Sequence, residues 1–241
     1  MMEGMATIKT ETLLAGDIGR MERETDMLMA TVMSLTEDEM RAPSKCEGWT
    51  RAHVVAHLAL GADAMGNLVT WATTGTETPA YASPQARDAY IEKAARLSAD
   101  ELKATLNEAN AKFLEAVNTL RQGVRVETVK MSSGDANPLS LPARRTTEII
   151  VHHDDLDTTW EWHEADPEAI VDAIEVCVKR LQANPESPGM TITAGEGEEW
   201  VVGDGSFRIF GYYDEILPFV AREQVEEGLE FDGELPKLPK W

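Results

Sequence analysis

GWTRAHVVAHL (residues 48–58) and RTTEIIVHHDDL (residues 145–156) are the two stretches of this 241-residue chain that decide its fold. In both, apolar residues recur at three- and four-residue intervals, which is typical of amphipathic helices. Thr50 is placed to cap the first helix, whose apolar face reaches Trp71. The second helix is expected from Pro142 to Trp160. Two such helices in one chain favour a helical bundle.

The flanking sequence is also helical over the first two thirds of the chain. Apart from a loop at 122–142 and a short turn capped by Thr36, helices are expected over residues 11–35, 84–97 and 101–120. After residue 167 the pattern changes to a helix at 169–181, β-like runs at 190–194, 200–203 and 207–210, and a last helix at 212–227. The expected fold class is α+β, with a helical bundle over residues 1–165 and a small α/β domain over residues 166–241.

The charge of the chain excludes several kinds of partner. Lysine and arginine number 22 against 43 aspartates and glutamates, a formal net charge of −21. So acidic a surface repels phosphate groups, which argues against nucleic acid and against docking on an anionic membrane. No apolar run has the length of a membrane span, and the first residues lack a secretory signal pattern. With only two cysteines the chain has no disulfide framework, so we expect a cytoplasmic protein.

Histidines gather in the two deciding stretches. His53 and His57 are four residues apart and share one helix face, as do Glu148 and His152, whereas His153 is turned away from Glu148. Two imidazoles and a carboxylate from two helices of a bundle are a common way to hold a divalent metal. The alternative is a set of packed core histidines, because spacings of four also arise by chance. The Glu148 carboxylate among apolar neighbours needs a partner, which favours the metal.

These motifs resemble a known family. The first is similar to the GWT…VVAHL signature of DinB-like metal-binding bundles, and the second to their R..E...HH.DL helix. The glutamate paired with histidine, and an SCP2-like C-terminal domain whose tail begins near Gly211, resemble the mycothiol-dependent maleylpyruvate isomerases. The resemblance implies a DinB-like four-helix bundle followed by a small α/β SCP2-like domain.

The resemblance also implies a ligand set. It aligns His57, Glu148 and His152 with the metal ligands, and leaves His53 as first-turn structure or as a residue lining the site. Two imidazoles and one carboxylate make Zn²⁺ the default ion, although Fe²⁺, Ni²⁺ and Mn²⁺ also suit these ligands. Asp155 either orients His152 or the metal-bound water, or is a charge near a helix end.

The implied reaction is the cis–trans isomerisation of maleylpyruvate to fumarylpyruvate, in gentisate-type aromatic catabolism. A thiolate adds to the activated double bond, the resulting single bond rotates, and the thiolate leaves. Mycothiol is the implied thiol; Cys177 lies on an apolar helix face, and Cys46 has no histidine nearby in sequence to activate it. Two alternatives stay open: a mycothiol-dependent S-transferase that conjugates electrophiles, and a non-catalytic metal- or ligand-binding module.

Because the protein is so acidic, binding a dicarboxylate substrate requires cationic side chains close to it. Arginine is suited to this, since its guanidinium group can donate two parallel hydrogen bonds to one carboxylate. Arg222 is the candidate for both catalysis and thiol binding, and Arg87 is a second catalytic candidate; for each, a surface ion pair is the equal alternative. Arg144 and Arg145 are expected to form surface ion pairs, although Arg144 shares a helix face with Glu148. The expected partners are a small dicarboxylate and a low-molecular-weight thiol, bound by a monomer.

Overall fold

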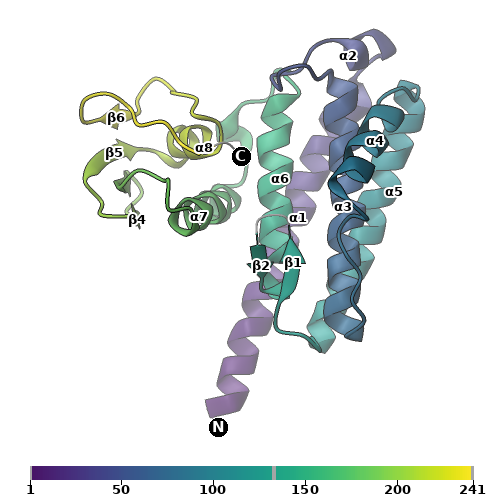
Figure 1. The fold of residues 1–241 in the computed structure, drawn as a ribbon, viewed down its shortest axis with the longest axis horizontal. Coiled ribbons are helices and arrows are strands. Elements are labelled where there is room, and N and C mark those ends of the chain that lie inside the picture. Colours follow the sequence, from purple (N-terminus) through teal and green to yellow (C-terminus); the bar gives the residue numbers. More distant parts are fainter. Residues whose placement is uncertain (1, 132–133, 240–241) are drawn as a thin grey trace. The chain divides into compact units, whose positions relative to one another are not determined.

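The computed structural model describes residues 2–131 and 134–239. Residues 132–133, in the loop expected at 122–142, and residues 240–241, at the end of the tail, lie outside this part. The chain divides into two compact units, Met1–Trp160 and Glu161–Trp241 (Figure 1). From sequence, the boundary between the two domains was expected after residue 165, slightly later in the chain than the division between these units. Helices with two small sheets confirm the α+β class.

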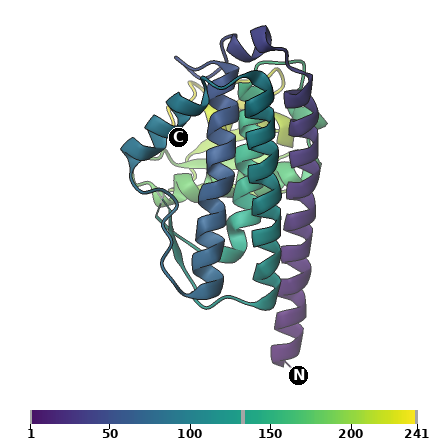
Figure 2. The same cartoon turned by 90° about the vertical axis from the view of Figure 1, so that its right-hand side faces the viewer.

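The first unit is a helical bundle. Its helices are α1 (Met2–Ser34), α2 (Glu37–Arg41), α3 (Arg51–Thr74), α4 (Pro84–Ala94), α5 (Ala99–Asn118) and α6 (Leu141–Asp155), with short 3₁₀ turns η1 (Thr119–Gln122) and η2 (Pro138–Ser140). The four long helices run alongside one another (Figure 2), with α1 and α3 each packed on both α5 and α6. Leu28, Leu58 and Leu106 are fully buried between them.

The loop expected before α6 contains a small hairpin. Strands β1 (Val129–Met131) and β2 (Gly134–Ala136) pair antiparallel, with Val129 opposite Ala136. Both of these side chains are buried against the core of the bundle. Burial of these two side chains attaches the strand pair to the bundle, although the sequence around them is mostly polar.

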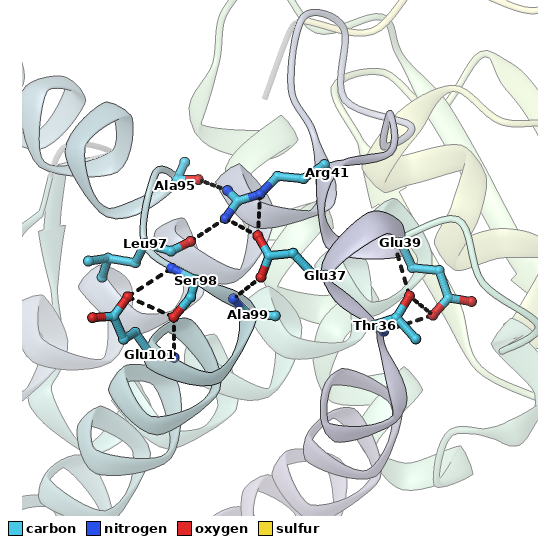
Figure 3. Close-up of polar contacts among 9 residues, drawn as sticks. All are labelled: Thr36, Glu37, Glu39, Arg41, Ala95, Leu97, Ser98, Ala99 and Glu101. Atoms are coloured by element: carbon cyan, nitrogen blue, oxygen red, sulfur yellow. Dashed lines mark hydrogen bonds and ion pairs between the residues drawn. The ribbon is translucent and has the colours of Figure 1, made fainter.

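Helix α2 is tied to the connection between α4 and α5 (Figure 3). The Glu37 carboxylate accepts hydrogen bonds from the Ala99 backbone N–H at 2.6 Å and from Arg41 Nε at 2.8 Å. The Arg41 guanidinium also donates to the carbonyl oxygens of Ala95, the C-cap of α4, and of Leu97, in the connection to α5. The contact with Ala95 satisfies a carbonyl group that the helix end leaves without a partner. Capping boxes begin both α2 and α5, and the one at α2 was expected.

Helix α6 ends at Asp155, earlier than the predicted end at Trp160. Asp157 adopts a left-handed conformation with φ 53°, which breaks the helical path. The Arg51 side chain donates to the carbonyl oxygens of Leu156 and Asp157 and so holds the end of the helix against the start of α3. The prediction failed here because the stop depends on a side chain from another helix.

The second unit contains η3 (Trp162–Glu164), α7 (Pro167–Ala183), β3 (Met190–Ala194), β4 (Glu199–Val202), β5 (Phe207–Gly211), α8 (Tyr213–Arg222) and β6 (Glu230–Phe231). The sheet order is β4-β3-β5-β6, with β3 antiparallel to β4 and parallel to β5. Helices α7 and α8 pack on each other and on the sheet. Helix α8 stops before the predicted residue 227 because Glu223 is left-handed, with φ 55°. None of the described helices, in either unit, has the length and apolar character of a membrane span.

Candidate metal centre

The three predicted ligands come together where α3 faces α6. His57 projects from α3, and Glu148 and His152 project from α6, with one ligand atom of each within 4.8 Å of the others. The Glu148 Oε2 atom lies 3.3 Å from His57 Nε2 and 3.5 Å from His152 Nε2. Both histidines are buried. Two imidazole nitrogens that converge on one carboxylate oxygen form a donor set suited to a divalent cation.

Asp155 fixes the orientation of one of these rings. Its Oδ2 atom lies 2.7 Å from His152 Nδ1, and the residue is 3% exposed. An Nδ1–H that donates to this carboxylate leaves the Nε2 lone pair directed at Glu148, as a metal ligand requires. Of the two interpretations offered for Asp155, orientation of His152 has the matching geometry.

Hydrogen bonds within the cluster change the pKa values of Glu148 and His152 against the effect of burial. Burial alone would raise the pKa of the Glu148 carboxyl, but hydrogen bonds from His152 and His57 hold that pKa well below its usual value. Burial also opposes charge on His152, yet hydrogen bonds with Asp155, Cys46 and Glu148 outweigh it and raise the pKa of His152 to about 10. The cluster therefore favours the ionised form of the Glu148 carboxyl, which is the form that binds a divalent cation.

His53 lies outside this cluster. Its Nδ1 atom accepts a hydrogen bond from the Thr50 backbone N–H at 3.2 Å and lies 2.7 Å from the Thr50 hydroxyl oxygen. On the other side of the ring, Nε2 is 3.7 Å from the Glu92 carboxylate. His53 also stacks on Trp49, whose ring in turn contacts His57. The side chain thus forms part of the first turn of α3.

Arg87 reaches the edge of the cluster. Ser83 caps α4 by accepting a hydrogen bond from the Ala86 N–H, which places Arg87 in the first turn of that helix. Its Nη2 atom lies 3.4 Å from His57 Nδ1, and the guanidinium interacts with Tyr81. Its Nη1 atom pairs with Asp88 Oδ1 at 2.9 Å, so the ion pair offered as the alternative for Arg87 is also present. Tyr81 was missed from sequence because it lies in a loop without a motif. Burial, followed by the negative charge of Glu148, raises the pKa of the Tyr81 hydroxyl.

The other predicted arginines have different surroundings. The expectation of a surface ion pair for Arg145 is wrong: its side chain is 1% exposed, and Nη2 donates to Asn110 Oδ1 at 2.9 Å. Arg144 is half-buried, with Nε 3.3 Å from the Ser140 hydroxyl. Arg222 ends α8 in the second unit, and its role in binding substrate and thiol stays a prediction.

The structure also gives Cys46 a neighbour that its local sequence lacks. The Cys46 sulfur lies within 4.8 Å of ligand atoms of His152 and Asp155. The Lys45 backbone N–H donates to the Asp155 carbonyl at 3.0 Å, and Lys45 Nζ lies 2.6 Å from Asp154 Oδ1, so this loop is attached to α6. Only the folded chain reveals the proximity, because the partner comes from a distant helix.

Comparison with known proteins bears on the family and the fold of the chain. The family model described as mycothiol maleylpyruvate isomerase N-terminal domain matches residues 21–157. Two similar solved structures are those of the mycothiol-dependent maleylpyruvate isomerase and of its histidine-to-alanine mutant, at 23% and 22% identity. Each has a TM-score of 0.84 and aligns over 95% of this chain and 97% of its own. No curated protein matches the chain. The solved structures establish the fold, and the family match shows that the chain belongs to the mycothiol maleylpyruvate isomerase family.

Proposed function

We propose that the protein is a mycothiol-dependent cis–trans isomerase that converts maleylpyruvate to fumarylpyruvate. The observation that carries the proposal is the convergence of His57, Glu148 and His152 at the contact of α3 and α6, in a chain of this family. The solved proteins of the same fold are named for this activity. Gentisate-type aromatic catabolism in the cytoplasm is the expected setting, and a monomer the expected state.

The proposed metal ligands are His57, Glu148 and His152, with Zn²⁺ as the default ion. Three protein ligands leave coordination positions that water or substrate can occupy. When bound, the ion would act as a Lewis acid that polarises a substrate oxygen or lowers the pKa of a thiol. The task of Asp155 is to hold the His152 ring in its ligand orientation, through the 2.7 Å contact with Nδ1.

Mycothiol would supply the sulfur nucleophile whose reversible addition allows the double bond to rotate. The protein's own contribution is to bind and orient the two reactants. We assign to Arg87, which lies beside His57, the binding of a carboxylate of the substrate, in place of its present ion pair with Asp88. We assign to Arg222 the binding of substrate and mycothiol, on the basis of its resemblance to the family's terminal segment. Cys177, which is 1% exposed in α7, has a packing role.

The test is to follow the ultraviolet absorbance of maleylpyruvate with metal-loaded protein, with and without mycothiol. We expect conversion only when the thiol is present, and none in the His57→Ala/His152→Ala double variant. The matched control is His53→Ala, on the same helix but outside the ligand set, which should retain turnover. A stable thioether product would support the S-transferase alternative, and absence of turnover with any thiol would support a binding module.

A further inference from the structure

A charged side chain is enclosed in the bundle one helical turn from the metal centre. Arg145, three residues before Glu148 on α6, is 1% exposed. Its guanidinium reaches α3 at Gly61, where a Cβ atom would lie 3.3 Å from Nη1, and α5 at Asn110, whose Oδ1 accepts from Nη2 at 2.9 Å. The absence of a side chain at Gly61 gives this guanidinium its space between the helices.

Two donors of this pair have no acceptor. Arg145 Nε and Asn110 Nδ2 are both buried, and neither has a hydrogen-bond partner among the residues that the structure describes. Both nitrogens can only donate. A buried donor without an acceptor costs about 1–3 kcal/mol, and more when its group is charged. Because the two side chains are hydrogen-bonded to each other, both donors lie in one neighbourhood and require the same kind of partner, a hydrogen-bond acceptor.

The charge of the neighbourhood indicates that this acceptor is an anion. Burial lowers the pKa of Arg145 to about 10, so the guanidinium is still protonated at neutral pH. The carboxylate that acts most strongly on it, that of Glu148, is already engaged by His57 and His152. A buried cation without a contacting anion is unfavourable, whereas a bidentate carboxylate fits a guanidinium.

We propose that Arg145 and Asn110 form a carboxylate-binding site inside the bundle, which holds the carboxylate of the substrate that lies away from the metal centre. This inference rests on the proposed function and adds two residues that would recognise its substrate. Three residues of α6 separate Arg145 from Glu148, a rise of about 4.5 Å along the helix. We expect a dicarboxylate to contact both sites, whereas an electrophile with a single acidic group would leave one of them without a ligand.

The test uses maleate, a cis-dicarboxylate, titrated by calorimetry into metal-loaded protein without any thiol. The informative variant is Asn110→Asp, because its carboxylate lies beside Arg145 and occupies the proposed site from within the chain. We expect maleate to bind the wild type, and to bind Asn110→Asp and Arg145→Met more weakly by about tenfold or more, the effect of one charge-assisted hydrogen bond. Asn107→Asp, an exposed change on the same helix that adds the same charge, should bind like the wild type.

Metal content and melting temperature establish that each variant is folded, and Asn110→Asp carries the test if Arg145→Met does not fold. Equal maleate affinity in Asn110→Asp and the wild type, or no binding to the wild type, overturns the inference. The outcome is separable from that of the proposed function. A protein that binds maleate through Arg145 but does not isomerise maleylpyruvate contradicts only the function. One that isomerises, with the maleate affinity and KM unchanged in Asn110→Asp, contradicts only this site.

Discussion

His152 makes two contacts that together define a metal ligand, with Asp155 on Nδ1 at 2.7 Å and Glu148 facing Nε2 at 3.5 Å. We expect about one divalent ion per chain in the wild type and loss of most of it in His152→Ala, because only two protein ligands remain. Elemental analysis of the purified protein measures this. Asp155→Asn should weaken metal affinity by about 10- to 100-fold, since the ring loses its fixed orientation.

The matched control for this prediction is His53→Ala, because His53 contacts Thr50 and Glu92 and lies outside the ligand cluster. Its metal content should equal that of the wild type. The ligand assignment is wrong if the His57→Ala/His152→Ala double variant keeps a stoichiometric ion.

Cys46 provides the second prediction. The serine variant should keep most of its mycothiol-dependent turnover, because the proposed nucleophile is the added thiol, although the Cys46 sulfur lies close to His152. Cys177→Ser should also retain the reaction, with some loss of stability because a hydroxyl replaces a thiol that is 1% exposed. Rate measurements with and without mycothiol decide the question. Turnover that needs no added thiol and disappears in Cys46→Ser would reverse the mechanism.

At the metal centre, the sequence predicts those contacts that depend only on the spacing of residues along one helix. Glu148 and His152 are four residues apart on one helix, so their shared face follows from helix geometry alone. Cys46 and Asn110 reach the α6 residues from a loop and from α5, which only tertiary packing brings close. The misassignment of Arg145 has the same origin, because a charged residue on a helix is exposed far more often than buried.

Helix α6 presents a second face to α1. His153, which the helical angle directs away from Glu148, hydrogen bonds through Nε2 with the Thr31 hydroxyl at 2.7 Å and stacks on Trp160 with ring centres 4.3 Å apart. Burial lowers the pKa of His153 from 6.5 to about 4. The folded state therefore holds this imidazole neutral at pH values where the unfolded chain protonates it.

The sign of the pH dependence follows from this depressed pKa. The stabilisation is complete above pH 6.5 and is lost as the pH falls towards 4, because the unfolded state then binds the extra proton. Between pH 7 and pH 5 the loss is about 2 kcal/mol. His153→Phe, which keeps a ring against Trp160, should lose about that much less stability over the same interval. Urea unfolding at both pH values measures the difference.

The control for the pH prediction is His163→Ala, since His163 is exposed in the turn η3. That variant should show the pH dependence of the wild type. An unchanged dependence in His153→Phe would mean that His153 is protonated to the same extent in the folded and the unfolded chain.

Helix starts were more predictable than helix ends. Thr36 and Ser98 lie three residues before glutamates, and this local pattern produces the observed capping boxes. The ends of α6 and α8 depend instead on left-handed residues at Asp157 and Glu223, neither of which is a glycine. For α6 the stop is reinforced by Arg51, a contact between distant parts of the chain that no local pattern encodes.

The whole chain, with its net charge of −21, repels an anionic substrate unless cationic side chains offset the repulsion locally. The bundle supplies Arg87 beside His57, and the second unit carries Arg222 at the end of α8. The resemblance carried by the two motifs predicted the α+β fold and the family, because each motif is one continuous stretch of sequence. The arginines carry no such local pattern, because a substrate ligand is defined by its neighbours in the folded chain, so their roles are tested by substitution.

Arg222 is accordingly the subject of the last prediction. Arg222→Ala should lower kcat/KM for maleylpyruvate by about 10- to 150-fold, the effect of losing one charge-assisted contact, with metal content unchanged. Arg222→Lys should be impaired almost as much, because lysine keeps the charge but not the bidentate fork. Arg208→Ala, an exposed change on β5 of the same unit, removes the same charge and should be near wild type. If Arg222→Ala and Arg87→Ala both match the wild type when folded and metal-loaded, neither arginine binds the reactants, and Arg145 becomes the principal candidate for the carboxylate.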